Sequence, residues 1–315
     1  MLNDKHIKEI NFPSGLKWIS VDKASKKQTS WLKEKYNFSD LDLKDIMPPL
    51  QRPKMIEYDD YLFIILQFPV YNRSNGEIDS SEIDFFIGKN YLITIHDGRL
   101  DPLNELFLEH SKKTKKNHDQ FDTNPGALLY ELLNSLLHYC FPMLNHINQD
   151  IDAIEKGIFD IDHGTNVNTI REIMRIKSNI VNFRKTMQAH KSIIQKLISH
   201  SEKLFTTHKL EVYYGNLVNH TKDIWEFLSN YKDTIDALHE AHESLVSHRL
   251  NQIMKTLTVF SVIVFPLTLF AAIFGMNTMN AMPFVDSPYD FWYIMGIMLF
   301  GVIAMILFFK TRKWM

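Results

Sequence analysis

The sequence predicts an α/β domain, a mixed sheet covered by helices, followed by long helices and a two-helix membrane hairpin. Three observations carry this prediction. Strand and helix patterns alternate over residues 1–122, no strand pattern returns after Pro125, and two uncharged apolar runs lie near the C-terminus. The runs cover residues 257–274 and 291–309, and as helices both are long enough to cross a bilayer core of about 30 Å.

Composition limits the classes of function. The chain has 315 residues, 45% of them hydrophobic, which suffices for one soluble domain and the hairpin. A net charge of −2 gives no indication of nucleic-acid binding, and the single cysteine, Cys140, excludes an intrachain disulfide. No phosphate loop, nucleophile elbow, zinc-hydrolase motif or Rossmann glycines occur, so we expect no enzyme and no catalytic residues.

The strands of the first 122 residues are predicted from apolar runs bounded by turns. They cover residues 15–21, 61–70, 82–87 and 91–95. The run at 61–70 is apolar almost throughout, which is typical of a strand buried on both faces, and residues 88–90 form a tight hairpin. Short helices are expected at residues 30–36 and 40–46, and Pro48 and Pro49 follow the second.

Two helices are predicted to form an antiparallel hairpin over residues 123–206. The helix at 126–159 carries acidic residues, whereas the helix at 167–200 carries basic ones. These charges suit solvated faces with pairs between the helices, and a metal-sensing surface is the alternative.

A third helix is predicted as a stalk over residues 207–256. Neither Gly nor Pro occurs between Gly215 and Pro266, so the helix can run into the first span without a break. Its apolar residues keep a heptad-like rhythm at Ile224, Leu228, Tyr231, Ile235, Leu238 and Leu245. Such a helix offers a mechanical route for gating, unless it is only a rigid stalk.

The charges around the spans predict their orientation. The loop of residues 275–290 contains no Lys or Arg. Basic residues lie outside the pair: His248, Arg249 and Lys255 before it, and Lys310, Arg312 and Lys313 in the tail of residues 310–315. The positive-inside rule then places both termini in the cytoplasm and the loop outside a cell membrane, inner or plasma.

One face of the first span is predicted to be polar or small. Its members recur at three- and four-residue steps: Asn251, Met254, Leu257 or Thr258, Ser261, Phe265, Thr268, Ala272 and Gly275. Two helices enclose no interior, so a polar pathway would need several copies of this face around one axis. The hydroxyls of Ser261 and Thr268 could instead bond backbone carbonyls, which explains them without a pathway. Pro266 is expected to loosen or kink the helix.

A motif at the outer end of this span carries a resemblance. Gly275-Met276-Asn277, with Pro266-Leu267-Thr268 before it, Met282-Pro283 after it and the closing KTRKWM, resembles the CorA family of divalent-cation channels. The similarity continues upstream at residues 51–63, 82–96 and 251–258, so it covers nearly the whole chain.

The resemblance implies a homopentamer in membrane lipid that passes Mg²⁺, and often Co²⁺ and Ni²⁺, into the cytoplasm without a coupled reaction. It assigns ion selectivity to Gly275, Met276 and Asn277, the polar pathway to Asn251, Ser261, Phe265 and Thr268, and a hydrophobic constriction to Met254 and Leu257. Mg²⁺ prefers oxygen ligands and sheds water reluctantly, which suits a ring of Asn277 amide oxygens. No cofactor is expected, with Mg²⁺ as the transported and possible regulatory ion.

The sequence departs from the family pattern in three places. Phe284 stands where an acid usually follows Met-Pro, which leaves Asp286 and Asp290 to attract cations at the outer mouth. Phe265 stands where relatives often have Met.

The third departure concerns regulation, because the family's regulatory acids are partly replaced. An acid pair reads Lys44-Asp45 here, and the stalk positions hold Asn216 and Asn219. We expect an Asp45–Asn216 site to bind Mg²⁺ weakly.

Two other functions stay open at this point. A CorA-like zinc transporter shares the architecture, but the 14 histidines are scattered without a tight metal spacing. A membrane-anchored oligomeric scaffold that conducts nothing would suit the long stalk, but it would leave Asn277 unexplained.

Overall fold

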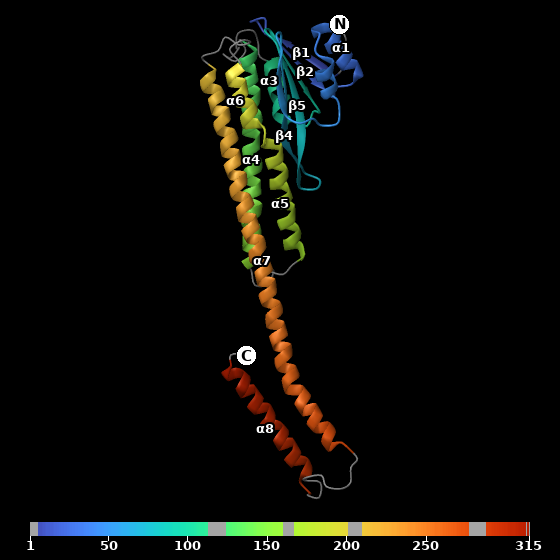
Figure 1. Cartoon of the computed structure of the whole chain (residues 1–315), viewed down its shortest axis with the longest axis vertical. Coiled ribbons are helices and arrows are strands. Elements are labelled where there is room, and N and C mark those ends of the chain that lie inside the picture. The colour runs from blue at the N-terminus through green and yellow to red at the C-terminus, as the bar shows by residue number, and fades with distance from the viewer. Residues whose placement is uncertain are drawn as a thin grey trace. The chain divides into compact units, whose positions relative to one another are not determined.

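The computed structural model describes residues 6–112, 124–159, 167–200, 210–276, 288–312 and 314. The chain divides into two compact units, residues 1–239 and residues 240–315, and each is described by itself. The first unit contains the sheet, six helices and the first part of a long seventh helix, and the second contains the rest of that helix and an eighth (Figure 1).

A mixed sheet forms the frame of the first unit, as the sequence predicts, but it has six strands rather than the four expected. Its strands are β1 (Ile7–Asn11), β2 (Lys17–Asp22), β3 (Lys54–Glu57), β4 (Leu62–Asn72), β5 (Glu77–Ile87) and β6 (Tyr91–His96). Their order is β1-β2-β6-β5-β4-β3, in which β2 and β6 are parallel and all other neighbours are antiparallel. The sequence did not predict the edge strands β1 and β3, because both are short and carry charged residues.

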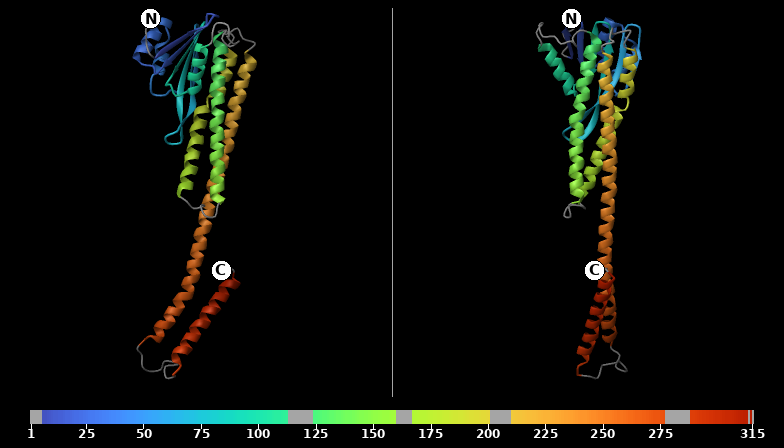
Figure 2. Two further views of the ribbon diagram at one scale, coloured as in Figure 1. Left: turned by 180° about the vertical axis from the view of Figure 1, so that it is seen from behind. Right: turned by 90° about the vertical axis from the view of Figure 1, so that its left-hand side faces the viewer.

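Each face of the sheet packs against its own layer of helices. The helices α1 (Lys26–Tyr36) and α2 (Asp40–Asp45) cover one face, where Phe63 and Phe86 are fully buried. The other face packs against α3 (Asp101–Lys112), α4 (Pro125–Phe159), α5 (Val167–Met187) and α6 (His190–His200). In both views of Figure 2, α4 (green), α5 (yellow-green) and the first part of α7 (orange) lie side by side.

The prediction of a single helix over residues 167–200 is wrong. The helix ends at Met187, and α6 begins at His190 after a two-residue turn. This turn allows His190 to lie buried with its ring 4.8 Å from that of Phe68, and Ile194 joins the same core. No Gly or Pro marks the turn, so tertiary packing rather than local sequence explains it.

Ion pairs join the helices of the first unit. Arg175 of α5 donates to Asp150 of α4 at 3.1 Å, which agrees with the expected pairing of an acidic and a basic helix. Lys177 of α5 lies 2.6 Å from Asp236 of the seventh helix. Hydrogen bonds from Lys177 and Lys232 lower the pKa of Asp236 below its ordinary value.

The helix α7 (Glu211–Phe274) contains 64 residues and would be about 96 Å long at 1.5 Å per residue. The predicted apolar stripe is confirmed up to Leu238, because Ile224, Leu228 and Ile235 are buried. Leu245, in the second unit, is exposed instead. The Tyr214 hydroxyl donates to the carbonyl oxygen of Gly126 at 2.8 Å and fixes the start of α7 against α4.

The second unit contains two helices that are long and apolar enough to cross a membrane. They are the end of α7 and α8 (Asp290–Thr311), and their most apolar windows are almost entirely exposed, unlike core helices of a soluble protein. Where the two helices approach, Val259 and Phe309 are buried, and Lys255 lies 6.0 Å from the centre of the Trp314 ring. The helix continues through Pro266.

Candidate functional site

The candidate site is the polar face of α7 within the second unit. At about 100° per residue, the predicted members fall on one side of the helix, and Val259, Ile263 and Phe270 fall on the opposite side. The structure agrees with this division. Val259 is buried and Ile263 and Phe270 are half-buried, whereas the predicted members are exposed except for half-buried Ser261: Asn251, Met254, Leu257, Phe265, Thr268 and Gly275. The second helix of the unit therefore leaves this face uncovered.

The threonine hydroxyls on this face donate to the backbone. Thr268 Oγ1 donates to the carbonyl oxygen of Val264 at 2.9 Å, and Thr258 Oγ1 donates to that of Met254 at 2.8 Å. These bonds explain how a hydroxyl is accommodated in a membrane helix, as the sequence allowed. They also commit the hydroxyl proton, so each oxygen presents only acceptor lone pairs outward. Water molecules around a cation donate hydrogen bonds to acceptors of this kind.

The described part of the Gly275-Met276-Asn277 motif, Gly275 and Met276, directly follows the end of α7. Gly275 N–H donates to the Ala271 carbonyl at 2.9 Å, and a Cβ added at Gly275 would lie 3.2 Å from that oxygen. The glycine therefore permits close packing at the helix end, and it does not adopt the left-handed conformation. Met276 is exposed.

The remaining outer residues cannot be placed in the same way. Asn277 and Asp286 lie outside the described residues, and so does the side chain of Asp290, which is the first residue of α8. Their proposed roles stay predictions.

The structure places the expected regulatory residues in the first unit. Asp45 ends α2, and its carboxylate forms an ion pair with Lys54 of β3. Asn216 is exposed on α7. In the described part of the chain, no group of three or more His, Cys, Asp or Glu side chains is arranged to hold a metal ion. The Lys54 charge, which sequence reasoning missed, opposes cation binding at Asp45.

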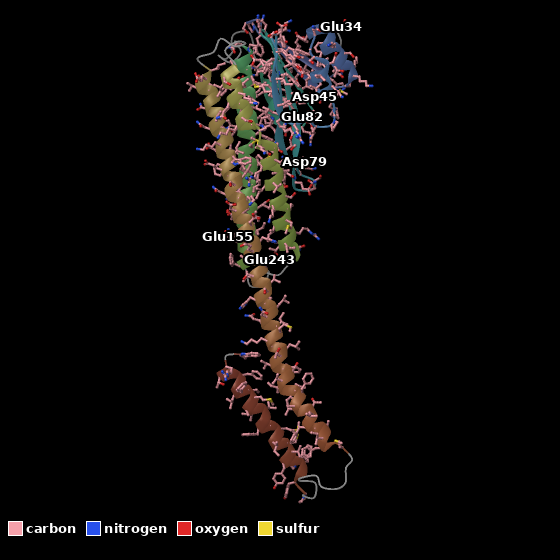
Figure 3. The ribbon with its side chains drawn as sticks, in the orientation of Figure 1. Glu34, Asp45, Asp79, Glu82, Glu155 and Glu243 are labelled. Atoms are coloured by element: carbon pink, nitrogen blue, oxygen red, sulfur yellow. The ribbon has the colours of Figure 1, made fainter. Side chains whose placement is uncertain are left out.

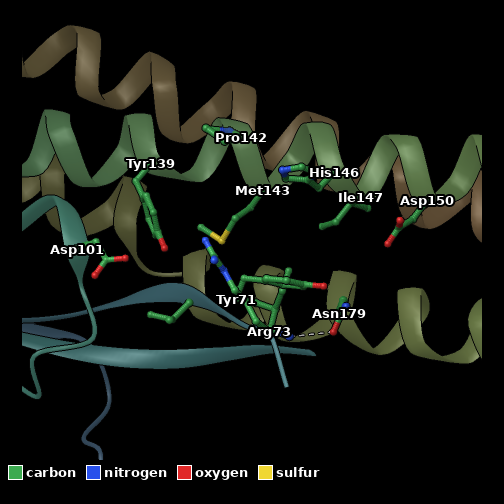
Figure 4. Close-up of a pocket in the computed structure, with 12 residues that line it drawn as sticks. Tyr71, Arg73, Asp101, Tyr139, Pro142, Met143, His146, Ile147, Asp150 and Asn179 are labelled. Atoms are coloured by element: carbon green, nitrogen blue, oxygen red, sulfur yellow. Dashed lines mark hydrogen bonds between the residues drawn. The ribbon is translucent and has the colours of Figure 1, made fainter. Parts of the chain in front are cut away.

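A cavity of about 550 Å³ lies between β4 and the helices α4 and α5 (Figure 4). Several of its polar groups are already engaged in the fold. Asp150 accepts a hydrogen bond from Arg175, and the Asn179 side chain bonds the backbone of Gly76 and Ile78. We therefore interpret this cavity as part of the structural joint between sheet and helices.

The fold and the exposed apolar helices define the class of protein: a membrane protein with an α/β domain and two candidate spans. The family model for "CorA-like Mg2+ transporter protein" matches residues 13–312. The chain belongs to this family of membrane transporters, so it is a transporter rather than an enzyme.

Individual relatives agree in length and fold. The cobalt/magnesium transport protein CorA of Thermotoga maritima is 27% identical over 287 residues, which are 90% of this chain and 78% of the relative. The protein of the same name from Methanocaldococcus jannaschii is 24% identical over 97% of this chain and 94% of the relative. The complete structure of the CorA magnesium transporter from M. jannaschii superposes with a TM-score of 0.83 at 23% identity, over 95% of this chain and 92% of that chain.

Proposed function

We propose that this protein is a channel that conducts Mg²⁺, and also Co²⁺ and Ni²⁺, into the cytoplasm down the electrochemical gradient. The observation that carries the proposal is the uncovered polar face of α7, on the side opposite the residues that are least exposed in this unit. Membership of the CorA-like family and the names of the two relatives support the choice of ions.

The conducting form is a homopentamer in membrane lipid, in which five copies of the α7 face surround one axis. Asn251, Ser261, Phe265 and Thr268 line the pathway in this arrangement. Because Mg²⁺ sheds its water slowly, the ion passes with much of its hydration shell, which donates hydrogen bonds to hydroxyl lone pairs and to a ring of Asn277 amide oxygens. Gly275 and Met276 shape the backbone beside that ring.

The gate is the ring of Met254 and Leu257, whose side chains are 60% and 57% exposed in the single chain. Apolar side chains that meet at a narrow axis exclude water and so block ions until the helices separate. The stalk can transmit that motion because α7 is one continuous helix. Asp286 and Asp290 concentrate cations at the outer mouth, and both termini lie in the cytoplasm.

Regulation by intracellular Mg²⁺ at Asp45 and Asn216 is weak in this protein. The ion pair with Lys54 neutralises Asp45, and Lys44 adds a second positive charge beside it. Asn216 contributes only a neutral amide.

Uptake into proteoliposomes that contain a Mg²⁺-sensitive dye tests the proposal. We expect voltage-driven uptake in the wild type and loss of uptake in Asn277→Ala, with Co²⁺ and Zn²⁺ measured alongside. Zn²⁺ flux that follows a proton gradient, without Mg²⁺ flux, would favour the zinc transporter. Absence of flux for every ion would favour the non-conducting scaffold.

A further inference from the structure

A buried carboxyl group lies at the centre of the sheet in the first unit. Asp84 of β5 is in register with Ile65 of β4 and Ile95 of β6, so its side chain enters the apolar layer that contains Phe86. It is 3% exposed, and its Oδ1 atom has no hydrogen-bond partner among the described residues. A buried acceptor without a partner is costly for a fold and needs an explanation.

This carboxyl group borders a cavity of about 470 Å³. Glu82, two residues earlier on the same face of β5, also lines the cavity, together with Pro48, Pro49 and Leu50. Glu82 Oε2 accepts one hydrogen bond, from the Gln51 N–H at 2.5 Å. Figure 3 shows Glu82 close to Asp45, whose charge acts on it.

The titratable groups around the cavity other than Lys23 and the two acids already have partners. Asp97 accepts from Ser81 and Arg99, and Lys54 pairs with Asp45. His96 accepts from the Gly98 N–H at Nδ1, so it is neutral and its Nε2–H donates to Ser20.

Glu82 and Asp84 therefore form no ion pair among the described residues, although the Lys54 charge acts on Asp84. Burial raises the pKa of Glu82 to about 7 and holds the pKa of Asp84 well above its ordinary value. Lys23, also at the cavity, is the remaining cationic group that lines it.

We propose that Glu82 and Asp84 bind one hydrated hard divalent cation, Mg²⁺ or Mn²⁺, inside the soluble part of a single chain. Mg²⁺ is commonly held by one or two carboxylates and keeps several of its waters, for which the cavity has room. No cage of three or more metal-ligating side chains occurs among the described residues, which argues against Zn²⁺ with its four-ligand preference. The cation supplies a positive charge in direct reach of two acids that form no ion pair among the described residues.

This site is separate from conduction. It lies on β5 of the first unit, whereas the proposed pathway lies on α7 of the second. Its lining also includes neither Asp45 nor Asn216, the expected regulatory residues. Binding can therefore be measured, and can fail, independently of ion flux.

Counting bound Mn²⁺ by electron paramagnetic resonance, on the purified full-length protein at pH 8, tests the proposal. Asp84→Asn, which keeps the shape and removes the charge, is expected to bind one Mn²⁺ fewer per chain than the wild type. Glu82→Gln alters only a half-buried side chain, and we expect at least tenfold weaker binding of the same ion. Added Mg²⁺ should displace it.

Asp79→Asn is the matched control, because Asp79 is an exposed acid on the same strand (Figure 3). This variant should bind as many Mn²⁺ ions as the wild type. The proposal is overturned if Asp84→Asn and Glu82→Gln bind Mn²⁺ as the wild type does. It is also overturned if Asp79→Asn loses as much bound Mn²⁺ as Asp84→Asn. If Asp84→Asn does not fold, Mn²⁺ binding by Glu82→Gln alone tests the proposal.

Discussion

The two units differ in whether the same residue types are buried or exposed. In the first unit Phe63 and Phe86 are fully buried between the sheet and its helices, whereas in the second Phe265 and Phe300 are 71% and 73% exposed. In the first unit charged side chains form ion pairs such as Lys54–Asp45 and Lys177–Asp236, whereas α7 beyond Lys255 carries no charge at all. The difference shows that the first unit buries its apolar side chains away from water, whereas the second exposes them as membrane-spanning helices do.

Replacing one phenylalanine in each unit tests this comparison most strongly. Phe86→Ala removes a fully buried ring and should destabilise the first unit by about 3–5 kcal/mol. Phe300→Ala should leave the unfolding temperature nearly unchanged, because its ring on α8 is 73% exposed and lies outside the proposed pathway. Thermal unfolding of the full-length protein in detergent measures both. Equal losses would mean that the second unit also has a packed core.

Arginine substitutions separate exposure to lipid from exposure to water. Phe300→Arg places a charge in the middle of α8, at a cost of about 3 kcal/mol for insertion into a bilayer. Phe159→Arg, at the exposed end of α4, should cost less than about 0.5 kcal/mol. The fraction of protein in alkali-washed membranes is the measurement. Equal membrane fractions for both variants would contradict α8 as a span.

Low pH should destabilise the fold of the first unit, because His190 takes up a proton more readily in the unfolded state. Burial lowers its pKa to about 4, so the folded state binds fewer protons than the unfolded state below the ordinary value of 6.5. The contribution of this group to stability is therefore complete above pH 6.5 and falls by about 2 kcal/mol by pH 5. His190→Met should flatten this part of the curve of unfolding temperature against pH, whereas His146→Met, at an exposed position, should not.

The smallest expected effect concerns the start of α7. Tyr214→Phe removes the hydrogen bond to the Gly126 carbonyl and should cost about 1 kcal/mol. Hydrogen exchange of the first turns of α7 should rise in this variant while exchange in β4 and β5 stays the same. A uniform rise across the first unit would show that this bond supports the whole fold rather than one helix end.

Sequence patterns predicted the parts that depend on local periodicity. The runs at β4, β5 and β6 and the uncharged spans have clear two- or three-to-four-residue periods, so the mixed sheet and the exposed face of α7 followed. The sequence patterns did not predict the break between α5 and α6 or the edge strands β1 and β3, because tertiary packing determines them.

Contacts of charged groups show even more clearly that local sequence patterns do not predict which distant residues meet. The pair of Asp45 and Lys54 joins α2 to β3, and no short-range pattern connects these residues. Asp84 looked like an ordinary polar residue of a strand, since only the register of β5 between β4 and β6 shows that it faces an apolar layer. Asn277 stays a prediction because it lies outside the described residues.

Cysteine accessibility tests most directly whether the uncovered face of α7 lines the ion pathway. The only native cysteine, Cys140, is buried, so new thiols can be labelled selectively. Thr268→Cys lies on the proposed face. Thr256→Cys is its matched control, because Thr256 donates the same kind of bond, to Gln252 at 3.0 Å, and lies about 120° around the helix from Thr268.

A charged thiol reagent applied to proteoliposomes should abolish Mg²⁺ uptake through Thr268→Cys and leave Thr256→Cys conducting. Equal block of both variants, or full uptake through labelled Thr268→Cys, would contradict the account.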